Sequence, residues 1–163
     1  MKYCHQFVVG TLIVLSCCMW ANEEIEPSHS NWPSFRGPDA CGVADGQNLP
    51  DKWDGESMQN IKWKLQIPGL SHASPIIWQN KLFVTTAVSG QGDTYFKHGL
   101  YGSGDASEDR SVHQWKVFCI EKKSGEVIWE KIATEGIPID KRHIKATYAN
   151  STPVTDGLSL IHI

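Results

Sequence analysis

The sequence lacks any excess of basic residues. It carries 15 Lys and Arg against 18 Asp and Glu, a formal net charge of −3, and no stretch gathers Lys and Arg into a basic stripe. Proteins that bind nucleic acids need such a stripe to neutralise phosphates. The composition therefore argues against a nucleic-acid-binding protein, and we expect no nucleic acid among its partners.

Motifs typical of catalysis or tight metal binding are also missing. The chain has no metal-spaced Cys/His cluster, no HExxH, no GxSxG and no phosphate-binding loop. Gly102–Gly104 lacks the third glycine and the preceding strand of a dinucleotide-binding loop. Asp105, Glu108 and Asp109 could offer oxygen atoms to Ca²⁺, but they lack the alternate spacing and the glycine of a calcium loop. We predict a solvated acidic loop and no metal site.

Long hydrophobic runs are scarce as well. The one apolar run, Phe7–Trp20, is shorter than the roughly 20 residues that a membrane-spanning helix needs. It follows Lys2 and precedes Ala21, an order that is typical of a secretory signal. We therefore predict a signal peptide over residues 1–21 and an exported protein, periplasmic or at the cell surface. Cleavage after Ala21 is favoured over lipid attachment at Cys17.

The segment after the signal has no periodic pattern. Residues 22–59 are first polar and then rich in Gly and Pro, so we predict a flexible and then irregular leader. Trp32 and Phe35 should be ordered within it, because they are costly to leave in water. Cys41 and Cys119 are the cysteines beyond the signal. Their flanks do not decide between one disulfide and two isolated buried thiols.

What the sequence does contain is β-strand alternation, together with seven Trp and 14 Gly. Residues 60–67 alternate as a strand. Residues 74–88 predict two strands joined by the turn Gln79-Asn80, and residues 117–131 predict a second hairpin. The connection over residues 89–114 is long, and long loops in compact domains are often functional.

Two parts of the chain repeat each other. Ile61-Lys62-Trp63-Lys64 matches Val127-Ile128-Trp129-Glu130, and Ser74-Pro75-Ile76-Ile77-Trp78-Gln79 matches Thr152-Pro153-Val154-Thr155-Asp156-Gly157. In both copies a Trp-bearing strand leads through a loop to a Ser/Thr-Pro-apolar strand and a tight turn. The loops differ in length, which repeat architectures tolerate. The structural repeat positions that we expect are Trp63, Pro75, Gly125, Trp129, Pro153 and Gly157.

Residues 118–129 carry the most specific pattern, Phe-Cys-Ile-Glu-Lys-Lys-Ser-Gly-Glu-Val-Ile-Trp. This stretch resembles the pyrroloquinoline-quinone-type propeller repeat, whose outer strands read apolar-x-Ala-x-Asp-x-x-Thr-Gly-x-x-x-Trp. Here Cys, Glu and Ser stand for Ala, Asp and Thr. The leader Trp32-Pro33-Ser34-Phe35-Arg36-Gly37-Pro38 and residues 141–157 are similar to a group of secreted bacterial proteins with such propellers. The resemblance covers residues 32–157.

The resemblance implies an all-β fold, a β-propeller of about seven or eight four-stranded blades. Residues 60–157 would supply the closing strand and about one and a half blades, so we expect an N-terminal fragment of such a propeller. Residues 158–163, LSLIHI, depart from the expected continuation. They back-translate to the transposase adapter end of common sequencing libraries. We favour that origin over a natural apolar strand.

In a propeller, the residues just before each innermost strand line the mouth around the axis. His72 and Asn150 occupy this place in the two copies. The candidate axial pocket consists of His72, Arg142, His143, Lys145, Tyr148 and Asn150. Such a pocket would be polar and partly cationic and would suit an anionic ligand. We favour the alternative that His72 and Asn150 bond backbone groups of neighbouring turns. We expect Trp63, Trp78 and Trp129 to pack between blades and not to form a stacking surface.

The resemblance leaves two functions open. The first is a non-catalytic binding or scaffold module, as in the propeller lipoprotein of outer-membrane assembly, with an unknown protein or a small anionic ligand as partner. The alternative is a dehydrogenase of alcohols or sugars that uses pyrroloquinoline quinone and calcium, with its site mostly in missing blades. Such enzymes hold an adjacent cysteine pair above the quinone, and here the only pair, Cys17-Cys18, lies in the predicted signal. We expect the first function and assign no catalytic residue or cofactor. A membrane would be contacted only through a lipid on Cys17.

Overall fold

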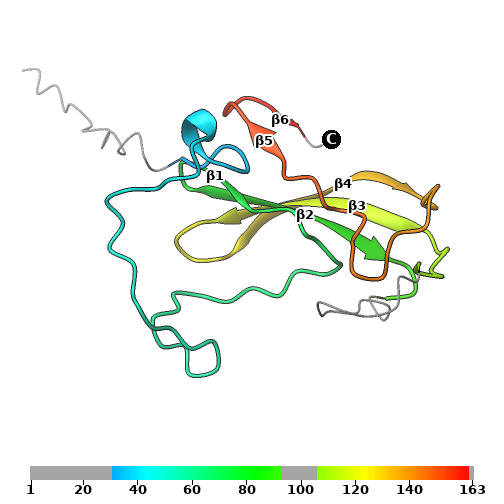
Figure 1. Cartoon of the computed structure of the whole chain (residues 1–163), viewed down its shortest axis with the longest axis horizontal. Coiled ribbons are helices and arrows are strands. Elements are labelled where there is room, and N and C mark those ends of the chain that lie inside the picture. Colours follow the sequence, from blue (N-terminus) through cyan, green and yellow to red (C-terminus); the bar gives the residue numbers. More distant parts are fainter. Residues whose placement is uncertain (1–30, 93–105, 162–163) are drawn as a thin grey trace, which may run out of the picture.

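The computed structural model describes residues 31–92 and 106–161 and shows an all-β chain (Figure 1). Its elements are a 3-10 helix η2 (Pro38–Ala40) and the strands β1 (Ile76–Trp78), β2 (Lys81–Ser89), β3 (His113–Glu121), β4 (Val127–Gly136), β5 (Val154–Thr155) and β6 (Leu160–Ile161). Strands β1 to β4 form one antiparallel sheet in chain order, and β5 pairs with β6. The predicted all-β class is confirmed, whereas neither sheet closes into a ring within the described residues.

Several predicted features lie outside the described residues. They are the signal peptide, Cys17, residues 22–30 of the leader, and residues 93–105 of the long connection with Asp105. Within the described ranges, no helix is long and apolar enough to cross a membrane.

The first predicted hairpin is confirmed. β1 and β2 pair through Trp78 and Lys81, which leaves Gln79-Asn80 as a two-residue turn. Gln79 adopts a left-handed backbone with φ 52°, as the first position of the favoured two-residue hairpin turns requires. The hairpin therefore forms where the alternation breaks.

The second hairpin is confirmed and is longer than the predicted 117–131. β3 and β4 pair from His113–Gly136 at one end to Ile120–Val127 at the other, with two register shifts between. The turn contains Gly125 with φ 78°, and its N–H donates to the Glu121 carbonyl oxygen at 2.8 Å. Glycine adopts this backbone without the steric cost of a Cβ.

The prediction of a strand over residues 60–67 is wrong. Ile61, Trp63, Leu65 and Ile67 are half-buried and the residues between them are exposed, as the alternation predicts. The segment is extended but forms no strand, because no described backbone pairs with it in a ladder. A strand requires hydrogen-bonded neighbours as well as an alternating sequence.

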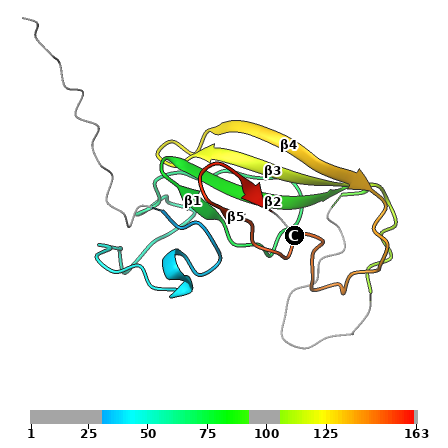
Figure 2. The same cartoon turned by 90° about the horizontal axis from the view of Figure 1, so that it is seen from above.

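The β1–β4 sheet is covered on both faces at its centre. Phe118, Cys119 and Ile120 are at most 2% exposed, although successive side chains of a strand point to opposite faces. The segment 60–67 runs along one face and Leu70 then pairs with Ala87 at the edge of β2, while β5 and β6 lie over the other face (Figures 1 and 2). Cover on both sides explains why this part of β3 is a continuous apolar run instead of an alternation.

Residues 158–163, which we expect to derive from an adapter, contain strand β6. Leu160–Ile161 pairs with Val154–Thr155, and Leu160 packs against a buried core cluster. The cluster consists of Ile76, Phe83 and Cys119. Residues 158–161 therefore take part in the described fold, while the origin of the segment stays a prediction.

Two tryptophans cover glycines in the described fold. The indole of Trp63 lies over Gly125, where a Cβ would come within 2.5 Å of the ring. Trp78 covers Gly157, which has φ 91°, in the same way. Trp129 differs, since it is 37% exposed. The first two rings therefore pack inside the described fold, and the third lies partly at its surface.

Candidate functional site

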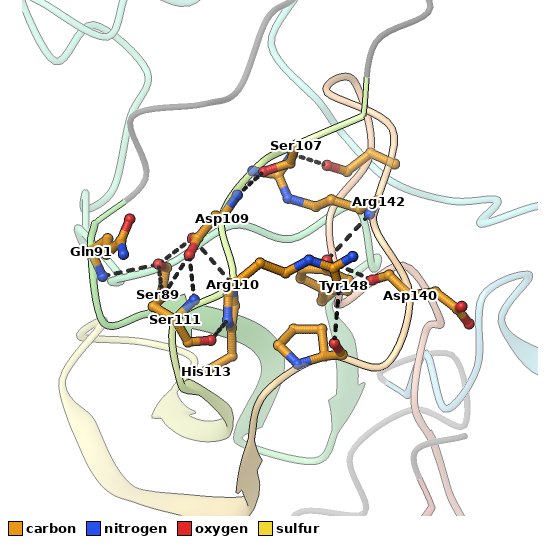
Figure 3. Close-up of polar contacts among 12 residues, drawn as sticks. Ser89, Gln91, Ser107, Asp109, Arg110, Ser111, His113, Asp140, Arg142 and Tyr148 are labelled. Carbon is orange, nitrogen blue, oxygen red and sulfur yellow. Dashed lines mark hydrogen bonds and ion pairs between the residues drawn. The ribbon is translucent and has the colours of Figure 1, made fainter.

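Two chain connections leave the same end of the β1–β4 sheet. The register pairs Ser89, the last residue of β2, with His113, the first of β3, and pairs His113 with Gly136, the last of β4. The β2–β3 and β4–β5 connections therefore begin side by side. Their described parts are also bonded to each other, since the Ser107 N–H donates to the Arg142 carbonyl oxygen at 2.8 Å (Figure 3).

The carboxylate of Asp109 lies at the centre of this end. It is buried and accepts hydrogen bonds from the Ser111 N–H at 2.9 Å, from the Ser111 hydroxyl at 2.6 Å and from the Ser89 hydroxyl (Figure 3). Burial is the largest single influence on the pKa of Asp109 and raises it, but the hydrogen bonds from Ser111 and Ser89 together hold the pKa below its ordinary value. The group is an ionised carboxylate inside the protein.

The imidazole of His113 lies beside this carboxylate. Its Nε2 is 3.5 Å from Asp109 Oδ2, and its Nδ1 is 3.0 Å from the Ser111 carbonyl oxygen. The ring of Tyr148 meets the imidazole edge-on, with 5.0 Å between ring centres. Because His113 is only 2% exposed, it cannot contact a substrate and acts within the structure.

Arg142 and Tyr148 are fixed by the backbone of the β4–β5 connection. The buried guanidinium of Arg142 donates to the Ala146 carbonyl oxygen at 2.9 Å and lies 5.9 Å from the centre of the Tyr148 ring. The Tyr148 hydroxyl donates to the Asp140 carbonyl oxygen at 2.8 Å. It also accepts a hydrogen bond from the backbone N–H of Arg142 at 3.2 Å. The positive charge of Arg142 is therefore directed at the protein's own carbonyl groups.

His72 and Asn150 are placed on neighbouring segments. The His72 N–H donates to the Ala149 carbonyl oxygen at 3.0 Å, next to Asn150 in the chain. The Asn150 side-chain oxygen accepts from the Thr147 hydroxyl at 2.8 Å and from the Thr147 N–H at 3.2 Å. Both His72 and Asn150 are exposed residues. The Asn150 side chain thus bonds a neighbouring turn, as the structural alternative expects.

His143 and Lys145 lie at the surface side of the same connection. His143 is exposed, and its Nδ1 accepts the Lys145 N–H at 3.1 Å. Lys145 is half-buried. The Arg142 guanidinium donates to the His143 carbonyl oxygen at 3.4 Å, so the contacts of the β4–β5 connection bring Arg142, His143, Lys145 and Tyr148 together.

Two adjoining grooves open on the sheet face beside this end. The first has a volume of about 540 Å³, and the second has about 450 Å³. Trp115, Thr134 and Tyr148 line both, and Asn150 lines the first alone. The charged residues among their linings are Glu135 and Asp140, in the second groove. The described grooves therefore carry carboxylates where we expected cations, and binding of an anion stays a prediction.

The prediction of a solvated acidic loop is wrong for Asp109, which is buried. Glu108 is exposed and pairs with Lys141 at 2.6 Å, and this hydrogen bond is the main cause of the lowered pKa of Glu108. Asp109, by contrast, is buried among hydroxyl groups. The difference arises because two connections close over Asp109, which spacing within one loop cannot reveal.

Ser89, Ser111 and His113 carry no motif that predicts a site. The available signal is their position, since each lies at or next to the end of a strand whose neighbours are apolar. A polar side chain that faces a core at such a position must find a partner. In this chain the partner of all three is Asp109.

The two described cysteines are not bonded. Cys41 is exposed and Cys119 is buried, and both are free thiols. Burial raises the pKa of the Cys119 thiol. The disulfide alternative is therefore wrong, and so is the expectation that both thiols are buried.

A metal site is not formed by the described residues either, since no group of three or more His, Cys, Asp or Glu lies close enough together in that part of the chain to hold an ion.

Comparison with known protein families, with curated proteins and with solved structures gave no match for this chain. The resemblance to the propeller repeat therefore stays a prediction from the sequence patterns.

Proposed function

We propose that this chain is part of an exported β-propeller of the pyrroloquinoline-quinone-like repeat type and works as a non-catalytic binding or scaffold module. The antiparallel β1–β4 sheet, with its strands in chain order, has the strand number and connectivity of one blade. Its cover on both faces agrees with a blade that lies between two neighbours. The short pair β5–β6 would be the inner part of the next blade.

The observation that carries the proposal is the contact between repeat-equivalent segments. Ser74-Pro75 and Thr152-Pro153 correspond in the repeat, and the Ser74 N–H donates to the Thr152 hydroxyl at 2.9 Å. β1 contacts β5, the strand that corresponds to it. Gln79 and Gly157, which also correspond, both have a left-handed backbone. Repeated units that pack on their neighbours bring equivalent segments together in this way.

Binding is favoured over catalysis by the state of the polar groups at the loop end. The side chains of Asp109, His113, Arg142 and Asn150 all bond groups of the protein itself. A surface built from two braced connections suits recognition of a partner, because binding residues are concentrated on loops held by a rigid scaffold.

The gene provides the test of the architecture. Reading the source DNA beyond the codon for Gly157 should reveal further units of the Ser/Thr-Pro, Ser-Gly and Trp type. A frame that stops at Ile163 would overturn the single-chain propeller.

The complete gene product provides the test of the function. When pyrroloquinoline quinone and Ca²⁺ are added, the absorbance of the purified protein should show no stoichiometric uptake of the quinone. Uptake together with reduction of a dye by alcohols or sugars, abolished by a chelator, would overturn the non-catalytic module. The same preparation tests export, since cleavage after Ala21 gives a mature protein that begins at Asn22, whereas lipidation gives a modified Cys17.

A further inference from the structure

The chain contains three Asp-Gly pairs, which are Asp45-Gly46, Asp54-Gly55 and Asp156-Gly157. Such a pair can rearrange without an enzyme. The backbone nitrogen of the glycine attacks the side-chain carboxyl carbon of the aspartate, and water leaves as a five-membered succinimide ring closes. Glycine favours this step because it has no Cβ to hinder the approach. Water then opens the ring, and one product is isoaspartate, whose main chain runs through the former side-chain carbonyl.

Exposure does not rank the three pairs, since all three aspartates are exposed residues. Ring closure requires a carboxyl group that can turn towards the following nitrogen, and a nitrogen that can leave its present partner. The hydrogen bonds of the carboxyl group and of the glycine N–H therefore decide which pair can react.

The carboxylate of Asp54 is held by the residues that follow it. Its Oδ1 accepts the Glu56 N–H at 2.8 Å, and its Oδ2 accepts the Ser57 hydroxyl at 2.8 Å. The bond from Glu56 is the main cause of the lowered pKa of Asp54, which disfavours the neutral carboxyl group, the form that loses water most readily. The Asp54 N–H also donates to the Gln59 carbonyl oxygen at 3.1 Å. Both the side chain and the backbone of this aspartate are therefore restrained.

The pair Asp156-Gly157 is restrained at both reacting groups. Oδ1 of Asp156 accepts the N–H groups of Leu158 at 2.9 Å and of Ser159 at 2.7 Å. The bond from Ser159 is the main cause of the lowered pKa of Asp156. The Gly157 N–H, which would be the nucleophile, donates to the Thr155 hydroxyl oxygen at 3.1 Å. Several hydrogen bonds must therefore break before this ring can close.

The pair Asp45-Gly46 has neither restraint. It forms a turn in the exposed leader between η2 and residues 60–67. Neither the Asp45 carboxyl group nor the Gly46 N–H has a hydrogen-bond partner in the part of the chain that the structure describes. A Cβ on Gly46 would meet no neighbouring atom, so the turn has space to change its shape. We propose that Asp45 is a site of spontaneous isoaspartate formation in the folded protein, whereas the fold protects Asp54 and Asp156.

This modification should not disturb the sheet. It adds one methylene group to the main chain within a segment whose residues are all exposed, and the Asp45 side chain bonds no part of the described fold. The product has the free α-carboxyl group that protein isoaspartyl methyltransferases recognise, and these enzymes transfer a methyl group to it from S-adenosylmethionine. The isoaspartate content of the leader should therefore rise with the age of the folded protein.

The test is incubation of the full chain at neutral pH and physiological temperature. Methyl transfer from labelled S-adenosylmethionine detects isoaspartate, and electron-transfer fragmentation of the digested peptides locates it. Asp45 should isomerise about tenfold faster or more than Asp54 and Asp156, because at each of those a hydrogen bond to an ionised group must break first. Equal rates at the three pairs, or a faster rate at Asp54 or Asp156, would overturn the proposal.

Incubation in urea separates the effect of the fold from that of the local sequence. The unfolded chain keeps the three Asp-Gly pairs but loses the hydrogen bonds, so the three rates should become similar. An unchanged lead of Asp45 in urea would mean that the local sequence ranks the sites, which contradicts protection by the fold. The matched variant is Asp45→Glu, which keeps the carboxyl group but cannot close the five-membered ring. It should remove the signal from this peptide, and a persistent signal there would also overturn the assignment.

Discussion

The indole ring of Trp63 lies against Gly125 at the turn between β3 and β4, and it leaves no room for a side chain there. The ring is fixed by a second contact, since its Nε1–H donates to the Lys122 carbonyl oxygen at 3.0 Å. This relationship attaches the extended segment 60–67 to the hairpin, although the segment belongs to no ladder. Stability should therefore depend on the glycine itself.

Replacement of Gly125 by Ala should destabilise the fold. A left-handed backbone costs a residue with a Cβ about 1–2 kcal/mol, and overpacking against the ring adds about 1–3 kcal/mol. Urea unfolding measures the change. The matched control is Gly136→Ala, because a Cβ at Gly136 meets no neighbouring atom; its effect should stay within about 0.5 kcal/mol. Equal unfolding midpoints for the two variants would contradict the role of the contact.

Asp109 should make the free energy of unfolding depend on pH in the acid range. Its pKa in the folded protein is lowered by the hydrogen bonds that outweigh burial, so its ionised form stabilises the fold. This contribution is fully present above the pKa of the unfolded chain and is lost as the pH falls through the folded pKa. Urea midpoints measured from neutral to acid pH should fall for the natural protein.

The Asp109→Asn variant should start from a lower midpoint and show a weaker fall. Glu108→Gln is the control, since the Glu108–Lys141 pair is exposed and screened by solvent. A pH profile of Asp109→Asn parallel to that of the natural protein would show that another group causes the dependence.

Two buried threonines should respond in opposite ways to Val. The hydroxyl oxygen of Thr85 has no hydrogen-bond partner among the described residues, so Thr85→Val should leave the free energy of unfolding unchanged within about 0.5 kcal/mol or raise it. The equally buried Thr147 donates to Asn150 Oδ1 at 2.8 Å, so Thr147→Val should cost about 1–3 kcal/mol. Denaturant unfolding compares them. A large loss for Thr85→Val would reveal a partner of its hydroxyl group.

The two described thiols should differ in reactivity. Cys41 is exposed, whereas Cys119 is buried in the core cluster and its pKa is raised by burial. A thiol reacts as its thiolate and must be reached by the reagent. Alkylation of the native protein, followed by peptide mass spectrometry, should modify Cys41 and should reach Cys119 only after denaturant is added. Equal modification of both thiols in the native protein would show that the core around β3 opens readily.

The hairpins could be predicted from the sequence because their information is local. Alternation and the turn residues Gln79-Asn80 and Gly125 determine both the strands and the points where they reverse. The segment 60–67 alternates equally well, but whether a ladder forms depends on a neighbouring backbone, which no local pattern supplies. The pair of Asp109 and His113 depends on two connections that meet in space. The burial of both groups follows from tertiary contacts and not from the spacing of the two residues.

The cover of β3 on both faces has a consequence for the order of folding. Each hairpin closes through near neighbours, on a timescale of about microseconds. The apolar side chains of β3 lose their contact with water only when residues 60–67 and residues 154–161 have also returned to the sheet from distant parts of the chain. Such long loop closures are entropically costly before any burial rewards them. The sheet should therefore exist transiently with both faces wet, and the commitment to the native state should come when the two flanking segments close over it.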